Sequence, residues 1–248
     1  MVGHFGLVEI AAILALVVLA PLAASHAVTP TGKHVPPFSG SSLLGHRVST
    51  TGCGGAASFV RTPAFNLTTG VGITFGKSSA TGCGPPGFPD DGATEGTTGM
   101  SSANFTPVGA GPWKITLNFT VSYAYNLTET GSSASRAAIS YGVAQLFLDS
   151  SAWDETTSTA YGTPSQNLLF SATTNGSASG VVSGHHSQSY LTISVVSNFT
   201  AGDHYIFLLY VVASELAHVD GGTSATASAL LNLATNGHHF KFNYWSFP

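Results

Sequence analysis

Two adjacent histidine pairs are the residues of this 248-residue chain whose type and spacing most suggest chemistry. His185 neighbours His186, and His238 neighbours His239. Imidazole nitrogens bind Zn²⁺ and Cu²⁺, so the two pairs together could supply four ligands. Neighbouring residues of a strand point to opposite faces, however, so one pair serves a single ion only where a turn is distorted. A zinc or copper site and four solvated turn histidines are therefore the two interpretations.

Acidic side chains form two further groups that could carry chemistry. Asp90, Asp91 and Glu95 lie in a segment rich in glycine and proline, where loop carboxylates could bind Ca²⁺. The EF-hand spacing is absent, and a solvated turn is the competing interpretation. Asp149, Asp154 and Glu155 lie around Trp153, and paired carboxylates beside an aromatic ring are typical of sites that act on sugars. A polar loop between strands explains this group equally simply.

The sequence contains no recognisable catalytic motif. Gly-x-Ser-x-Gly, His-Glu-x-x-His, a Walker loop and a dinucleotide-binding glycine pattern are all missing. Serine, histidine and aspartate are present, but their spacing does not single out a catalytic triad. We therefore expect a protein that is not an enzyme. Carbohydrate binding through exposed Trp153, Tyr161 or Tyr190 is one alternative.

Cys53 and Cys83 each lie in the tetrapeptide Thr-Gly-Cys-Gly. Two strand-like runs, 57–65 and 71–76, separate them and flank a turn centred on Thr68. A hairpin with this centre pairs positions whose numbers sum to 136, and the two cysteines fulfil that sum. An exported chain meets oxidising conditions, so the spacing predicts a disulfide at the base of the hairpin. A metal site would need further cysteine or histidine ligands nearby.

Six Asn-x-Ser/Thr sequons occur in a chain that has ten asparagines. This excess over chance indicates N-glycosylation of an exported protein, while the alternative is that Asn and Thr simply populate turns and polar strand faces. The candidate glycosylation sites are Asn66, Asn104, Asn118, Asn126, Asn175 and Asn198.

Charged side chains are scarce, at 7% of the residues against roughly 25% in a typical soluble domain. The 31 Ser and 28 Thr supply most of the polar surface instead. Seven Lys and Arg cannot form a basic patch, which excludes nucleic acid as a partner. Low charge also weakens the repulsion between subunits, so it favours self-association or packing against other cell-surface proteins.

An apolar run from Ile10 to Ala24 marks the amino-terminal region. Its length fits the core of a signal peptide better than a membrane span of about 20 residues. Small residues follow, so we expect residues 1–27 to be a signal peptide cleaved after Ala27. An uncleaved membrane anchor is the alternative. The run that begins at Gly6 also resembles the processing region of type IV pilins, which implies a filament.

The rest of the chain has the pattern of an all-β protein. From Trp113 to Leu127 the odd positions are apolar and the even positions mostly polar, which predicts a strand with one buried and one wet face. Asn118 and Asn126 fall on the wet face. The turn pair Asn236-Gly237 predicts a hairpin that places Leu233 opposite Phe240.

About nine strands with turn signals between them predict a single antiparallel β-sandwich, either jelly-roll or immunoglobulin-like. We assign residues 51–248 to this domain and 28–50 to an extended, proline-containing segment before it. Within the domain, the sequence predicts the disulfide-stapled hairpin 53–83 and a long loop over 82–103.

Three features carry a resemblance to a known group of proteins. They are the twin Thr-Gly-Cys-Gly, the dense sequons and the run 201–205, Ala-Gly-Asp-His-Tyr, which opens an apolar strand. In these the chain resembles uncharacterised secreted β-sandwich proteins of archaea, particularly Thermoplasmata. The resemblance implies an archaeal surface protein and carries over no functional residue.

These observations lead to one main functional hypothesis and two alternatives. We expect an exported, glycosylated, secreted or cell-surface β-sandwich with a structural, adhesive or filament-forming role. The segment 28–50 could add a strand to a neighbouring sheet. An extracellular carbohydrate-binding module and a histidine-rich metal-binding protein are the alternatives.

Overall fold

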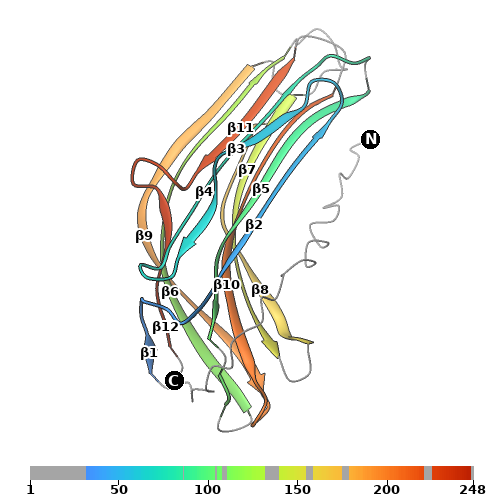
Figure 1. Cartoon of the computed structure of the whole chain (residues 1–248). Helices are drawn as coiled ribbons and strands as arrows, with labels where there is room; N and C mark the ends of the chain where they lie inside the picture. Colours follow the sequence, from blue (N-terminus) through green and yellow to red (C-terminus); the bar gives the residue numbers. More distant parts are fainter. Residues whose placement is uncertain are drawn as a thin grey trace.

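The computed structural model describes residues 32–85, 87–103, 105–107, 111–131, 140–154, 159–174, 179–220 and 225–246. In these ranges the chain forms strands and no helix (Figure 1). The described part therefore contains no helix of the length and apolar character that a membrane span requires. The strands are β1 (Lys33–His34), β2 (Gly40–Thr51), β3 (Ala56–Asn66), β4 (Val71–Thr81), β5 (Pro89–Ser102), β6 (Gly111–Thr130), β7 (Ser140–Asp154), β8 (Thr159–Thr173), β9 (Ser179–Phe199), β10 (Tyr205–Asp220), β11 (Thr226–Asn232) and β12 (His239–Ser246).

Two antiparallel sheets share these strands, and they run along the length of an elongated, curved molecule (Figure 1). The five-stranded sheet has the order β2-β5-β10-β7-β8. The seven-stranded sheet has the order β1-β12-β4-β11-β6-β9, with β3 paired to the outer side of β4. The expected all-β, antiparallel architecture is confirmed.

Alternating side chains from the two sheets form one main hydrophobic core. On β6 the buried residues include Leu117, Phe119 and Leu127, all at the odd positions. On β10, Leu209 and Val211 contribute from the facing sheet. The period of two in the sequence thus sets which face of each strand is buried.

The described residues form twelve strands rather than the nine or so expected, and the strands that the sequence did not predict are β1, β2 and β5. The missed β1 and β2 belong to the segment 28–50, which we expected to lie before the domain. Instead β1 pairs with β12 in one sheet, and β2 pairs with β5 over twelve residues in the other. The assignment of the described residues 32–50 to a separate segment was therefore wrong, although their extended conformation is confirmed.

The expected long loop over 82–103 was also wrong, because residues 89–102 form the inner strand β5. This strand has almost no large apolar side chain, so it lacks the usual signal of a buried strand. Its buried face consists of glycine, threonine and Asp90, followed by Met100. Small residues are needed there because a Cβ atom on Gly92 would lie 2.1 Å from the Ala56 carbonyl oxygen. Close approach of backbone to backbone explains the composition.

The disulfide-stapled hairpin is confirmed. Strands β3 and β4 pair through a turn in which the Gly70 N–H donates to the Asn66 carbonyl at 2.8 Å. Two register shifts change the sum of paired positions from 137 beside the turn to 135 at the base. The Cys53–Cys83 disulfide closes the base, with a Cα–Cα distance of 6.0 Å.

The expected hairpin at Asn236-Gly237 was wrong, although its turn is present. Both residues have positive φ, and the His238 N–H donates to the Thr235 carbonyl at 3.0 Å. The flanking strands do not pair with each other. β11 and β12 lie end to end between β4 and β6, and both pair with the same side of β6. Residues 233–238 form a loop that leaves the sheet between them.

Local turn chemistry was therefore read correctly, but the pairing was decided by longer-range contacts. β4 and β6 offer two long hydrogen-bonding edges, and each arm pairs with these edges rather than with the other arm. The Asn232 side chain starts this loop by accepting the N–H groups of Ala234 and Thr235. Leu231, Leu233 and Phe240 are all buried, so their assignment to the core holds.

The polar face of β6 is less exposed than expected. Asn126 is exposed, but Thr120 and Ser122 are buried. Asn243 covers this face from β12, and its Nδ2 donates to Asn118 Oδ1 at 3.0 Å and to Thr120 Oγ1 at 2.7 Å. The neighbouring strand therefore satisfies polar groups that we had placed in solvent.

Candidate functional site

The adjacent carboxylates Asp90 and Asp91 are the centre of the best-defined polar site in the described residues. They begin β5, and their side chains point to opposite faces of its sheet because they are neighbours in a strand. Asp90 is buried and Asp91 is half-buried. Each carboxylate accepts hydrogen bonds from a different set of residues.

Asp90 holds the base of the hairpin beside the disulfide. Its Oδ1 accepts the Gly54 N–H at 3.0 Å, and its Oδ2 accepts the Cys83 N–H at 3.1 Å. The N–H of Gly54 contributes most to holding the pKa of Asp90 below its ordinary value; burial opposes this, and further backbone N–H groups support it. The ionised carboxylate thus fixes the two ends of the hairpin to β5.

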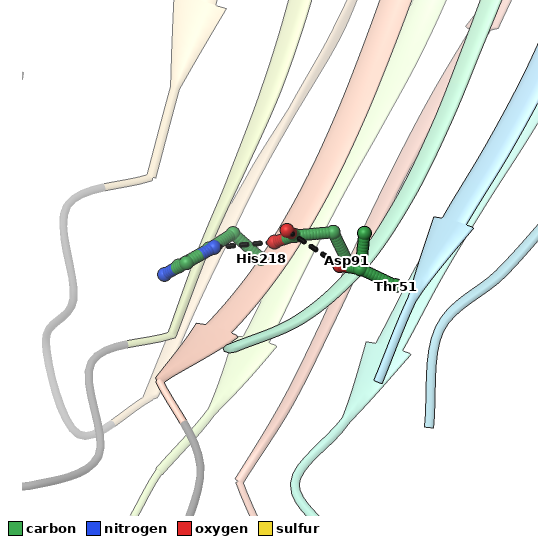
Figure 2. A network of polar contacts seen from close by, with 3 residues as sticks. All are labelled: Thr51, Asp91 and His218. Carbon is green, nitrogen blue, oxygen red and sulfur yellow. Dashed lines mark hydrogen bonds and ion pairs between the residues drawn. The ribbon is translucent and has the colours of Figure 1, made fainter. Parts of the chain in front are cut away.

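Asp91 joins three strands of the five-stranded sheet on its outer face (Figure 2). Thr51, at the end of β2, donates its hydroxyl hydrogen bond to Asp91 Oδ2 at 2.7 Å. His218 Nδ1, on β10, contacts Asp91 Oδ1 as a hydrogen bond and ion pair. Burial raises the pKa of Asp91, but the hydrogen bonds from His218 and Thr51 outweigh it and hold the pKa below its ordinary value.

The order of groups in this network does not match a nucleophilic triad. In a triad the histidine lies between the nucleophile and the carboxylate, so that it can remove the hydroxyl proton. Here Asp91 lies between Thr51 and His218, and both of its oxygens accept hydrogen bonds (Figure 2). The network therefore ties the three strands together and does not have the arrangement of a nucleophilic triad.

A second polar group is buried between the two sheets. Glu215 of β10 is 1% exposed, and its Oε2 accepts a hydrogen bond from Thr94 Oγ1 of β5. Burial raises the pKa of Glu215 to about 8, against the effect of hydrogen bonds from Thr94 and the Gly76 N–H. The side chain is therefore a neutral carboxylic acid at neutral pH. In the described residues, Glu215 Oε1 and Thr74 Oγ1 have no hydrogen-bond partner.

Of the four histidines proposed as metal ligands, His185 and His186 lie on β9, whereas His239 begins β12 and His238 directly precedes it. β9 and β12 pair with opposite sides of β6. His186 stacks on Tyr123 with ring centroids 5.2 Å apart, and His238 Nδ1 lies 3.0 Å from Ser122 Oγ. Burial lowers the pKa of His238, and His185 and His239 lower it further. The histidines are thus close enough to influence one another.

They do not, however, form the closest set of ligand-type side chains. In the described ranges, the one group of three or more with donor atoms within 4.8 Å of one another is Cys53, Cys83 and Asp90. Its two sulfur atoms are joined in the disulfide, and Asp90 already accepts backbone N–H groups. Sulfur in a disulfide lacks the thiolate charge that binds metal ions.

The candidate glycosylation sites fall in different surroundings. Asn66 and Asn126 are exposed, whereas Asn118 is half-buried and accepts a hydrogen bond from Asn243. Asn104 and Asn175 lie outside the described residues. For Asn198 only the backbone is described, and it pairs with Pro112. Asn66 Oδ1 also accepts the N–H of Thr68 at 2.9 Å, which leaves its Nδ2 available for a glycan.

The three aromatic residues of the carbohydrate hypothesis are divided between the sheets. Trp153 lies on β7 and Tyr161 on β8 in the five-stranded sheet, while Tyr190 lies on β9 in the seven-stranded sheet. Their side chains lie outside the described part. The backbone therefore brings two of the three onto neighbouring strands and leaves the third on the other sheet.

Sequence reasoning placed Asp90 and Asp91 in a loop and did not identify their partners. His218 comes after the apolar run 205–213 in the sequence. Thr51 and Asp91 become its neighbours only through the pairing of β2, β5 and β10. Glu215 carried a clearer signal, because it is an ionisable residue two positions after the apolar run 205–213, in the same strand.

Comparisons with known proteins identify no family. No protein-family model matches the chain. No curated protein matches its sequence. Among solved structures, the chain has a weak match to the carbohydrate-binding module TmCBM61 in complex with β-1,4-galactotriose. The match covers 79% of this chain and 86% of that module, with 11% identity and a TM-score of 0.18. A TM-score this low does not establish a shared fold.

Proposed function

We propose that the chain is an exported β-sandwich protein with a structural or adhesive role at the cell surface. The observation that carries this proposal is the use of the Asp90–Asp91 pair. One carboxylate holds the hairpin base beside the disulfide, and the other joins β2, β5 and β10. Because both carboxylates form hydrogen bonds between strands, we infer that they make the fold rigid and do not serve as reactive groups.

The remaining chemistry of the chain supports the same role. The disulfide Cys53–Cys83 suits an oxidising, extracellular compartment. Asn66 and Asn126 are exposed, so both sequons are accessible for glycan attachment. The low charge, at 7% of residues, leaves hydroxyl-rich surfaces that repel one another weakly.

Fractionation of native cells tests this proposal. Cytosol, membrane, cell-envelope and medium fractions are probed with an antibody against the folded protein, and the purified protein is screened on a polysaccharide array. We expect the protein in the envelope or medium, with no saturable glycan binding. A cytosolic protein would contradict the proposal, and saturable binding of one polysaccharide would favour the carbohydrate-binding alternative.

A further inference from the structure

Strand β2 is an edge strand with one open side. It forms one end of the five-stranded sheet, where Figure 1 shows it beside β5. Its pairing with β5 runs from Gly40 with Ser102 to Thr51 with Asp91 and contains no register shift. Among the described residues, no strand pairs with the other side of β2. Its outer row of backbone N–H and C=O groups can therefore accept another strand.

Apart from the two-residue β1, the other edge strands carry features that hinder such pairing, whereas the ladder of β2 is regular. β3 contains Pro63 and two register shifts, and β8 contains Pro164 and lies in a ladder with two shifts. The ladder of β9 also has one shift. β2 has neither proline nor lysine, and its ladder is regular. Proline, charged side chains and bulges are the usual means by which proteins protect an edge, and of these β2 has only Arg47.

β2 is also held in place before any partner arrives. The Asp91 network fixes its end at Thr51 (Figure 2). Near its start, Ser42 Oγ donates to the Phe65 carbonyl of the other sheet at 3.1 Å, and the Ala103 N–H donates to the Ser39 carbonyl at 2.7 Å. A strand that is already ordered loses little conformational entropy when it pairs.

The sequence of β2 is complementary to itself in the antiparallel direction. Leu44 and Val48 are 53% and 45% exposed, and a spacing of four places them on one face of the strand. If two copies pair about His46, Leu44 of each lies opposite Val48 of the other. Arg47, the only Lys, Arg, Asp or Glu in β2, then lies opposite Gly45 and not opposite a second arginine. Two apolar cross-strand pairs form without facing like charges.

We propose that β2 pairs with β2 of a second copy, antiparallel and centred on His46, so that the five-stranded sheets of two molecules become one continuous sheet. This inference rests on the proposed structural role and names the partner through which it acts. The pair has two-fold symmetry, which is the commonest arrangement of homodimers.

A variant whose β2 edge carries an added charge tests the proposal in the mature, disulfide-bonded chain. Val48→Lys adds a charge at the pairing edge, and Val181→Lys is the matched control, because Val181 is 71% exposed on the different edge strand β9. Sedimentation equilibrium measures the dimer dissociation constant of each protein. We expect Val48→Lys to raise this constant at least tenfold and Val181→Lys to leave it unchanged. A monomeric parent chain, or a dimer that both variants weaken equally, would overturn the proposal.

Cysteine cross-linking tests the register separately. His46→Cys places two thiols opposite each other at the two-fold axis, whereas Thr50→Cys places them roughly 26 Å apart at about 3.3 Å per residue. We expect air oxidation to produce a covalent dimer of His46→Cys and not of Thr50→Cys. The reverse result would refute this register. Envelope localisation with a monomeric chain would leave the structural role standing and reject edge pairing, whereas a β2-dependent dimer found in the cytosol would reject the role alone.

Discussion

Replacing Glu215 with glutamine should change how the stability of the fold depends on pH. The folded-state pKa of Glu215 is about 8, because burial disfavours its charge, while its ordinary value is 4.5. A raised folded-state pKa means that the carboxyl group favours the fold fully below about pH 4.5. This contribution is lost as pH rises through 8, because the folded state must then bury a negative charge between the sheets.

The expected size of this effect follows from the pKa difference. At about 1.4 kcal/mol per pKa unit, the shift from 4.5 to about 8 corresponds to a loss of at most about 5 kcal/mol in the free energy of unfolding. Glutamine has nearly the same shape and stays neutral, and its Oε1 can still accept from Thr94. Glu215→Gln should therefore remove most of this dependence and be more stable than the parent chain at pH 8.

Urea unfolding followed by circular dichroism at pH 4.5, 6, 7 and 8 measures the effect. Asp220→Asn removes a carboxylate from the half-exposed end of the same strand and serves as the control. We expect the control to keep the parent slope. A parent chain whose free energy of unfolding does not fall between pH 4.5 and 8, or a Glu215→Gln variant with the parent slope, would refute the reasoning.

Three further predictions concern the close packing of β5, the Asp90 contacts at the hairpin base and the disulfide. Each is tested by urea unfolding at neutral pH unless another condition is given. Gly92→Ala should lower the free energy of unfolding by about 2 kcal/mol or more, because its Cβ would lie 2.1 Å from the Ala56 carbonyl oxygen. The control Gly45→Ala, whose Cβ would lie 3.5 Å from Thr97, should lower it by less than about 0.5 kcal/mol. Equal losses in the two variants would contradict the packing account. Asp90→Asn should cost about 2 kcal/mol, because charge-assisted bonds to the N–H groups of Gly54 and Cys83 are lost. Since the pKa of Asp90 is lowered in the fold, this difference should shrink as pH falls below about 4, and a difference that persists in acid would speak against it. The double variant Cys53→Ser/Cys83→Ser should lose about 3–4 kcal/mol, as expected for a disulfide that spans 30 residues, and an unchanged urea midpoint would rule out its stabilising role.

The parts of the fold that could be predicted are those in which a local pattern and a long-range contact agree. The alternation along β6 marks its buried odd positions, and the spacing of Cys53 and Cys83 around the turn near Thr68 identifies the hairpin and its disulfide. The predicted disulfide tolerates small register shifts, because a shift of one residue in either direction still leaves the two cysteines adjacent.

The errors arise where neighbours distant in the sequence decide the structure. The buried side chains of β5 are mostly glycine and threonine, so no apolar pattern marks this strand. Its small residues are explained only by the close approach of β4 and the Ala56 backbone. Asn236 and Gly237 form the expected turn, but the edges of β4 and β6 take up both arms.

The candidate site was accessible to sequence reasoning only in part. Asp90 and Asp91 stood out as adjacent carboxylates, but a turn was the natural interpretation while β5 remained unrecognised. Their partners Thr51 and His218 lie 40 and 127 residues from Asp91, and only the strand order brings them together. The histidine pairs stood out equally and lie on β9 and at the start of β12, on opposite sides of β6. The closest ligand-type group in the described chain is nevertheless the disulfide with Asp90.

Peptide mapping of the native protein by mass spectrometry, without added reductant, tests the central claim most directly. We expect an amino-terminal peptide that starts at or near Val28, a peptide pair cross-linked through Cys53 and Cys83, and glycan mass on Asn66 or Asn126. These three features together identify an exported, oxidised and glycosylated chain. An intact amino terminus with free thiols and unmodified asparagines would contradict the account of a cell-surface structural protein.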